Sequence, residues 1–262
     1  MDLELQGKRV LVTGGSRGIG LACAAGFLRE GARVAIVSRS EANLEAARAA
    51  LQPFGSDLAT VAADLRDADD AARAVQDAVA ALGAIDILVN SAGAARRTPP
   101  AELTPQAWRD AMDAKYFSYI NVIDPVIKRM AQQGGGAIVN VIGMGGKVAS
   151  PTHLPGGAAN AALMLATAGL ANAYGGQGVR VNAVNPGGTH TERLQQGLEA
   201  EARLSGLTIE QMMAKANARV PLGRLAAPEE IADAVLFLAS ARASYICGAV
   251  VSMDGAATPI VV

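Results

Sequence analysis

Short apolar runs recur along the chain, and segments with helical spacing separate them. The runs are uninterrupted instead of alternating with polar residues, which is typical of strands buried on both faces. Strands that alternate with helices form a parallel sheet with helices on both faces, so the pattern predicts a doubly wound α/β sheet of about seven strands. The predicted strands span residues 10–12, 34–37, 59–63, 85–89, 137–142, 179–184 and 247–252.

Polar residues and prolines between the runs indicate where helices begin. Thr104 is expected to cap a long helix that extends towards Met130, and Pro228 to begin another. Residues 154–174 carry no charge, but their many Ala, Gly and Asn residues would insert poorly into a membrane, so we interpret them as a buried helix. Further helices are predicted at 41–51, 68–82 and 198–219. No linker or repeat divides the chain, so residues 1–262 are expected to form one domain.

Residues 8–39 contain a strand, a glycine-rich turn, a helix and a second strand. Gly14, Gly18 and Gly20 stand where the backbone must turn tightly, approach a pyrophosphate and let the helix pack against the sheet. The N-terminus of the helix offers free N–H groups to phosphates. The stretch therefore predicts a Rossmann-type dinucleotide site, and the alternative is a glycine turn without a ligand.

The other polar or glycine-rich motifs also follow predicted strands. Ligands of a doubly wound sheet lie outside the carboxyl ends of its strands. The shared position of the motifs therefore predicts one binding crevice along that edge. The motifs are Arg39, Asp64 and residues 90–93, 143–146 and 186–191.

Composition and charge exclude several classes of protein. The 262 residues have a formal net charge of −1 and no basic run, so we expect no nucleic-acid partner. Cys23 and Cys247 fit neither a metal site nor a disulfide framework and indicate a reducing compartment. The first eight residues contain acids and no apolar run typical of a signal peptide. We expect a cytoplasmic protein with no metal and no membrane contact.

These motifs resemble those of the short-chain dehydrogenase/reductase family over essentially the whole chain, in the manner of a 3-oxoacyl-acyl-carrier-protein reductase. TGGSRGIG resembles the family's cofactor motif, and NSAG at 90–93 its NNAG motif. Asp64 and Leu65 match the pair that meets adenine, the 186–191 loop matches the one beside the nicotinamide, and residues 254–255 match the family's usual ending. The cofactor-binding residues that the motifs and the resemblance imply are Gly14, Ser16, Arg17, Gly18, Ile19, Gly20, Ser38, Arg39, Asp64, Leu65, Asn90, Ala92, Gly93, Pro186, Gly187, Thr189 and Thr191.

The end of the second strand decides which nicotinamide cofactor is expected. Sites that prefer NAD usually place an acid there, which accepts a hydrogen bond from the ribose 2′-hydroxyl. Here Ser38 holds that place, Arg39 follows it, and Arg17 lies in the phosphate loop. Two guanidiniums can bind a 2′-phosphate, so we expect NADP(H) in preference to NAD(H). Alternatively, Arg39 stacks on adenine and Arg17 is a solvated surface charge.

The resemblance fails at the family's catalytic tetrad of Asn, Ser, Tyr and Lys. The Asn place falls at Lys115 and the Ser place at Gly143. The Tyr and Lys places fall at Gly156 and Asn160, and residues 154–173 contain neither Tyr nor Lys. All four residues are replaced, so the family's usual proton transfer through tyrosine cannot operate in this chain.

Lys115, His153 and Asn160 are the candidate catalytic residues. The Lys115 ammonium could stabilise an alkoxide or act as an acid, and Tyr119 lies one helical turn away on the same face. His153 precedes the former Tyr place by three residues, and imidazole is a natural general acid or base. Alternatively, Lys115 is a structural charge and Tyr119 packs in the core. For His153, and for His190 in the loop after the sixth strand, the alternative is a solvated side chain.

Residues of about 189–220 occupy the place of the family's substrate lid. Leucine, isoleucine and methionine make this segment apolar on one side, which suits a hydrophobic or flexible small-molecule substrate. Alternatively, the apolar side packs on its own domain or on a neighbouring copy. Small residues along 158–173 would let two helices approach closely, and the resemblance implies a homotetramer, or a dimer, formed through this helix.

Two classes of function follow from these observations. The first is an NADP(H)-dependent oxidoreductase that acts on a carbonyl or alcohol with a non-standard catalytic site. The second is a catalytically silent NADP(H)-binding scaffold or sensor, with a non-redox enzyme on the same fold as an intermediate form. The intact cofactor motifs favour cofactor binding in every version, and the missing tetrad favours the second class.

Overall fold

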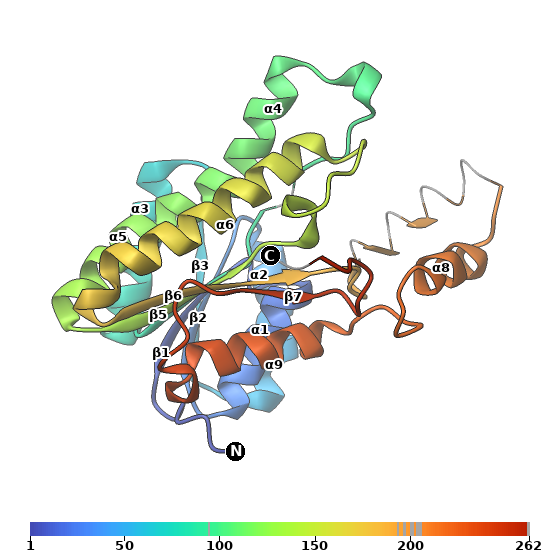
Figure 1. The fold of residues 1–262 in the computed structure, drawn as a ribbon. Helices are drawn as coiled ribbons and strands as arrows, with labels where there is room; N and C mark the ends of the chain where they lie inside the picture. The colour runs from blue at the N-terminus through green and yellow to red at the C-terminus, as the bar shows by residue number, and fades with distance from the viewer. Residues whose placement is uncertain (94, 193, 196–197, 200–201, 203–205, 261–262) are drawn as a thin grey trace.

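The structure is a computed structural model, and it describes residues 1–93, 95–192, 194–195, 198–199, 202 and 206–260. In this part of the chain, seven parallel strands form one sheet in the order β3-β2-β1-β4-β5-β6-β7 (Figure 1). The strand order reverses between β1 and β4, so the prediction of a doubly wound sheet is confirmed. The strands are β1 (Arg9–Thr13), β2 (Arg33–Ser38), β3 (Leu58–Ala62), β4 (Ile87–Asn90), β5 (Gly136–Val141), β6 (Val179–Pro186) and β7 (Val250–Met253).

Helices cover both faces of the sheet (Figure 1). One core cluster joins the sheet to α1, α2 and α9, and a second joins the opposite face to α3, α5 and α6. Neighbouring strand residues alternate between the clusters, as Val10 and Leu11 do, because successive side chains of a strand point to opposite faces. The helices are α1 (Gly18–Arg29), α2 (Glu41–Leu51), α3 (Ala68–Leu82), α4 (Pro105–Ala111), α5 (Ser118–Gln133), α6 (Leu154–Tyr174), α8 (Ile209–Ala218) and α9 (Pro228–Ala239).

Two strands begin later than their apolar runs predict. β7 starts at Val250 instead of residue 247, because Gly248 has a φ of +82° and its N–H donates to the Val181 carbonyl, which turns the chain before the strand. β4 starts at Ile87, although Ile85 is also buried. The apolar runs therefore located the strands but not their first residues.

The long helix predicted from Thr104 contains a π-helical turn over Met112–Phe117, between α4 and α5. The wider turn changes the hydrogen-bond pairing of the helix, and such turns often occur at functional sites. The Ser118 hydroxyl lies 3.1 Å from the carbonyl oxygens of both Ala114 and Lys115 and donates to this pair. Lys115 thus lies on an irregular turn that the sequence pattern did not predict.

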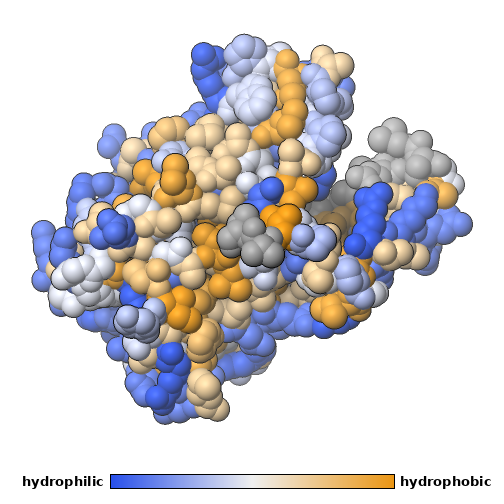
Figure 2. Space-filling model, in the orientation of Figure 1, coloured by the Kyte–Doolittle hydropathy of each residue, from blue (hydrophilic) through white to orange (hydrophobic). Residues whose placement is uncertain are grey.

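Helix α6 is confirmed over its predicted length, but it is buried on one face only. With the short turn after it (Leu154–Gln177), it is long and apolar enough to cross a membrane by length and composition alone. Its buried residues recur every three or four positions and face the sheet, whereas Leu165 is 77% exposed. Pale and orange side chains of low polarity gather over α6 on the face shown in Figure 2.

The predicted lid, residues 189–220, is described in part. Thr208 and Gln211 form a capping box that begins α8, and this helix lies apart from the sheet (Figure 1). The predicted helix at 198–219 is therefore confirmed over Ile209–Ala218. Residues 193, 196–197, 200–201 and 203–205 lie outside the described residues.

A chain of buried hydrogen bonds joins three strands to α6. Thr13 Oγ1 donates to Asn90 Oδ1 at 3.3 Å, and Asn90 Nδ2 donates to Asn140 Oδ1 at 3.0 Å. Asn140 Nδ2 in turn donates to Thr167 Oγ1 at 3.0 Å. All four residues are at most 1% exposed. A fully paired polar chain in the interior is specific in geometry, so it fixes β1, β4, β5 and α6 in register.

Replacing Asn140 with Leu is expected to lower the free energy of unfolding by about 1–3 kcal/mol, because the Asn90 amide and the Thr167 hydroxyl would lose their buried partner. Urea denaturation followed by circular dichroism measures the loss. Asn172 on α6 is exposed, so Asn172→Leu is the matched control and should change the value by less than about 0.5 kcal/mol. Equal stability of the two variants would contradict a structural role for the chain of hydrogen bonds.

Candidate active site

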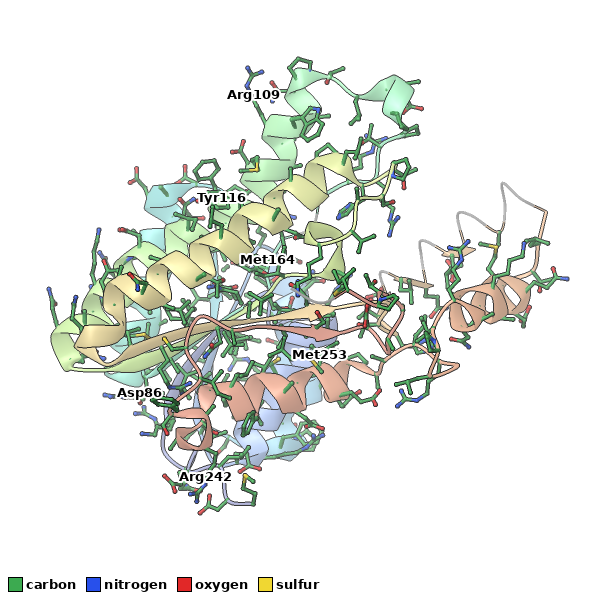
Figure 3. All side chains as sticks on the ribbon, viewed as in Figure 1. Asp86, Arg109, Tyr116, Met164, Arg242 and Met253 are labelled. Atoms are coloured by element: carbon green, nitrogen blue, oxygen red, sulfur yellow. The ribbon has the colours of Figure 1, made fainter. Side chains whose placement is uncertain are left out.

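The phosphate loop joins β1 to α1 at the carboxyl edge of the sheet. In Figure 3, Met253 marks this edge at the end of β7, and Asp86 lies at the opposite edge. Gly14 and Gly18 adopt φ values of +65° and +52°, which favour glycine. A Cβ on Gly20 would lie 2.2 Å from the Gly14 carbonyl oxygen, so α1 can pack this closely only with glycine there.

The loop is open to an anion. Arg17 occupies the N-cap of α1, no side chain caps the helix, and its first turn contains no acid. The N–H groups of that turn and the positive end of the helix dipole therefore face the loop. The NSAG segment supports the loop from the side, because a Cβ on Gly14 would lie 2.8 Å from Ala92 N. This cradle of close backbone contacts fits the pyrophosphate of a dinucleotide.

Ser38 and the two candidate arginines lie around the end of β2. Ser16 Oγ donates to Ser38 Oγ at 3.0 Å, which places the phosphate loop beside β2. Arg17 donates to Asn43 Oδ1 at 2.6 Å and lies 3.4 Å from Glu192, and its side chain is 58% exposed. Arg39 is exposed. Arg17 is thus engaged with Asn43 and Glu192, and Arg39 is exposed directly after the end of β2.

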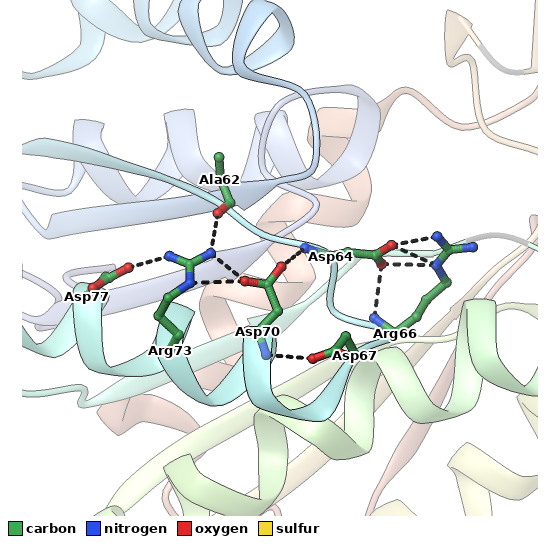
Figure 4. Close-up of polar contacts among 7 residues, drawn as sticks. All are labelled: Ala62, Asp64, Arg66, Asp67, Asp70, Arg73 and Asp77. Atoms are coloured by element: carbon green, nitrogen blue, oxygen red, sulfur yellow. Dashed lines mark hydrogen bonds and ion pairs between the residues drawn. The ribbon is translucent and has the colours of Figure 1, made fainter.

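Asp64 is held by Arg66 (Figure 4). The Arg66 backbone N–H donates to its carboxylate at 3.1 Å and the guanidinium at 2.5–3.0 Å. These hydrogen bonds, opposed in part by burial, hold the pKa of the Asp64 carboxyl below its usual range. The Asp64 N–H donates to Asp70 at 2.6 Å, and Arg73 fixes Asp70. Asp64 therefore remains ionised after the carboxyl end of β3, and its carboxylate is paired with the Arg66 guanidinium.

The loop after β6 reaches the phosphate loop from the other side. A Cβ on Gly18 would lie 3.2 Å from Thr191 Cγ2. Thr189 is 7% exposed and pairs with Ala226 in a short bridge. The structure thus brings both ends of the predicted cofactor site together, although they are far apart in the sequence.

Two of the residues that the resemblance implies for cofactor binding, Asn90 and Ile19, also support the fold. Asn90 is fully buried in the chain of hydrogen bonds and supports the crevice from below. Ile19 packs against the hydrophobic core. Sequence reasoning missed Asn140 and Thr167, although a polar residue inside an apolar run was the signal that could have found them.

Gly143 and Gly156, which the resemblance aligns with the family's Ser and Tyr, both lie where a side chain would not fit without strain. Gly143 has a φ of +131°, where a serine would be strained. A Cβ on Gly156 would lie 2.2 Å from Cε1 and 2.6 Å from Nε2 of His153. The imidazole therefore fills the space in which a tyrosine side chain at residue 156 would begin.

Asn160 lies beside Gly143 and Gly145. The ideal Cβ position of Gly143 is 3.4 Å from Asn160 Nδ2, and that of Gly145 is 3.5 Å from the same atom. Asn160 is 5% exposed, and its amide nitrogen lies close to both glycines.

Lys115 and Tyr119 meet, as their spacing predicts, but in the interior. Lys115 Nζ donates to Tyr119 Oη at 2.8 Å and to the Val141 carbonyl at 3.0 Å. Tyr119 Oη donates to the same carbonyl at 2.6 Å. Tyr119 is fully buried, and burial raises the pKa of its hydroxyl, which therefore stays protonated. This buried pair holds the end of β5 through the Val141 carbonyl.

The second histidine lies apart from these residues. His190 is exposed, and its backbone N–H donates to the Ala226 carbonyl. His153 is partly buried at the N-terminus of α6, with His153 N–H bonded to Ser150 O at 2.9 Å. Of the two histidines, His153 is the one that lies among the former tetrad places.

Residues 14–258 match a family model described as enoyl-(acyl carrier protein) reductase. The chain is 39% identical over 260 residues to D-threitol dehydrogenase of Mycolicibacterium smegmatis, covering 98% of this chain and 95% of the relative. It is 36% identical over 256 residues to the 3-oxoacyl-[acyl-carrier-protein] reductase FabG of Chlamydia muridarum, covering 97% and 99%.

Solved structures agree with these relatives. L-sorbose reductase of Gluconobacter frateurii, determined with NADPH and L-sorbose, superposes with a TM-score of 0.94 at 28% identity over 100% of both chains. The actinorhodin polyketide ketoreductase, determined as a variant with NADPH, gives a TM-score of 0.93 at 28% identity over 97% of this chain and 98% of its own. The fold, the crevice and the relatives together show that this chain belongs to the short-chain dehydrogenase/reductase family of oxidoreductases.

Proposed function

We propose that this protein is an NADP(H)-dependent oxidoreductase that interconverts a carbonyl group and an alcohol in the crevice at the carboxyl edge of the sheet. The observation that carries the proposal is the end of β2, where Ser38 stands in place of an acid and an exposed Arg39 follows it, with Arg17 in the neighbouring phosphate loop. An acid there would repel a 2′-phosphate, whereas guanidiniums bind it. NADPH in the structures of the L-sorbose reductase and the ketoreductase supports this cofactor.

Each part of the crevice has a role in binding. The first turn of α1 and the glycines of the phosphate loop receive the pyrophosphate. The loop from Pro186 to Thr191 borders the nicotinamide side, and Thr191 Cγ2 lies 3.2 Å from the ideal Cβ position of Gly18. When bound, the nicotinamide supplies or accepts a hydride, and the protein orients the substrate and excludes water.

The second candidate is a silent NADP(H)-binding scaffold or sensor, or a non-redox enzyme. The observation that favours it is the backbone at Gly143, whose φ of +131° disfavours a serine, together with the loss of Tyr and Lys at Gly156 and Asn160. NADPH absorbance in the presence of ketones, aldehydes, quinones and sugars such as L-sorbose separates the two candidates. Tight binding without oxidation of NADPH by any of these compounds would favour the scaffold.

The same proposal includes a cytoplasmic homotetramer or dimer and a lid formed by residues 189–220 over a small, apolar or flexible substrate. The exposed face of α6 supports the assembly, because Leu165 is 77% exposed on a helix whose other outward residues are small or uncharged. Sedimentation velocity measures the oligomeric state.

In the proposed lid, helix α8 begins at a capping box.

Replacing Arg39 with Ala is expected to weaken NADPH binding by about 10- to 100-fold, because a charge-assisted hydrogen bond to the 2′-phosphate is lost. NADH has no 2′-phosphate, so its dissociation constant should not change. Fluorescence titration measures both constants. Arg109 is exposed on α4 (Figure 3), and Arg109→Ala removes the same charge away from β2 as the control. Equal weakening of NADPH and NADH would contradict the role of Arg39.

Replacing Lys115 with Met is expected to lower the free energy of unfolding by about 1–3 kcal/mol, because the Val141 carbonyl and the Tyr119 hydroxyl lose a buried donor. NADPH affinity should stay unchanged, because Lys115 supports β5 and does not border the phosphate loop. Lys128 is exposed on α5, and Lys128→Met is the control. A folded Lys115→Met protein that binds NADPH and has lost all turnover would instead give the ammonium a catalytic role.

A further inference from the structure

The place of the missing tyrosine holds an imidazole, not empty space. The ideal Cβ position of Gly156 lies 2.2 Å from His153 Cε1 and 2.6 Å from Nε2. A side chain at residue 156 and the imidazole of His153 therefore exclude each other. We infer that His153 is the proton-transferring residue of this oxidoreductase and that the Asn160 amide is a second hydrogen-bond donor to the substrate oxygen.

Two side-chain nitrogens lie beside Gly145. His153 Nε2 and Asn160 Nδ2 each lie 3.5 Å from the ideal Cβ position of Gly145, and His153 Cδ2 lies 3.0 Å from it. Because Gly145 carries no side chain, the imidazole and the amide lie next to the same short stretch of backbone. Two nitrogen donors this close together can both reach one oxygen that becomes negative during hydride transfer.

The surrounding backbone holds the imidazole in place. The His153 carbonyl accepts a hydrogen bond from Gly157 N at 2.7 Å, which ties the residue to the first turn of α6. The loop after β4 is bonded to Thr152, the residue before His153, because Thr98 N–H donates to the Thr152 carbonyl at 2.9 Å. Ala95 borders the ring, since its Cβ lies 2.8 Å from the same ideal Cβ position of Gly156. The loop after β4, the turn after β5 and the start of α6 thus each border the imidazole.

The chemical step balances with the nicotinamide of the proposed function as hydride donor. In reduction, the substrate carbon gains the hydride and the C=O electron pair moves to oxygen. The N–H bond of the protonated imidazole breaks, its proton moves to that oxygen, and the bonding pair stays on nitrogen. Solvent then reprotonates the ring. Alcohol oxidation is the reverse, with neutral imidazole as the base.

The inference rests on the proposed function, and its test separates the two. His153→Gln and His153→Ala are expected to bind NADPH as the wild type does and to lose about 100- to 10,000-fold in kcat, the usual contribution of a general acid or base. Added imidazole should restore part of the activity of His153→Ala. NADPH bound without change and kcat retained by both variants would overturn the role of His153 and leave the proposed function standing.

A readout without turnover is the imidazole ¹⁵N spectrum. The chain has two histidines, so the signals that remain in His190→Gln belong to His153. The probe is NADP⁺ with trifluoroethanol, an alcohol that resists oxidation. We expect the His153 ring signals to shift with both compounds together and to lose that shift in Asn160→Leu. Signals unmoved by the probe would overturn the inference, and failure of the wild type to bind NADP⁺ would overturn both proposals.

Gly156→Ala tests the exclusion directly, because its new Cβ would displace the ring. It is expected to lower kcat by at least about tenfold, since misplaced catalytic groups cost rate even when ligands bind. Gly169 lies on the same helix with no atom within 4 Å of its ideal Cβ position, so Gly169→Ala is the matched control. Equal kcat in the two variants, with equal NADPH affinity, would contradict an active imidazole at this place.

Discussion

The structure depends on the buried chain of hydrogen bonds from Thr13 through Asn90 and Asn140 to Thr167. It joins the carboxyl ends of β1, β4 and β5 to the middle of α6, and each buried amide costs stability unless its partner is in place. The register it imposes sets the phosphate loop on one side of the crevice and the start of α6 on the other. Cofactor binding and the former catalytic places are therefore positioned by the same contacts.

A steric exclusion at the start of α6 accounts for the glycine at residue 156, the place that the resemblance assigns to the family's tyrosine. The imidazole of His153 occupies the space of a side chain at residue 156, so a tyrosine there is incompatible with it. Gly143 adopts a backbone conformation that favours glycine, so the serine is disfavoured too. Asn160 stands where the resemblance places the family's lysine, and its amide lies beside Gly143 and Gly145.

Sequence reasoning predicted the sheet, most helices and the crevice, because apolar runs, glycines and strand ends have local signatures. TGGSRGIG and NSAG lie side by side as expected, with Gly14 against Ala92. The π-helical turn at Lys115, the burial of the Lys115–Tyr119 pair and the pairing of Arg66 with Asp64 were not predictable. They depend on backbone angles and on contacts between distant elements, as does the ring of His153 against Gly156.

The central claim is that NADP(H) chemistry in this crevice uses an imidazole in the tyrosine's place. A crystal structure with NADP⁺ and trifluoroethanol tests it most directly. We expect the 2′-phosphate on Arg39 and the alcohol oxygen about 3 Å from the imidazole of His153, within hydrogen-bond distance. An imidazole turned out to solvent, with the Lys115 ammonium at the alcohol oxygen, would contradict it.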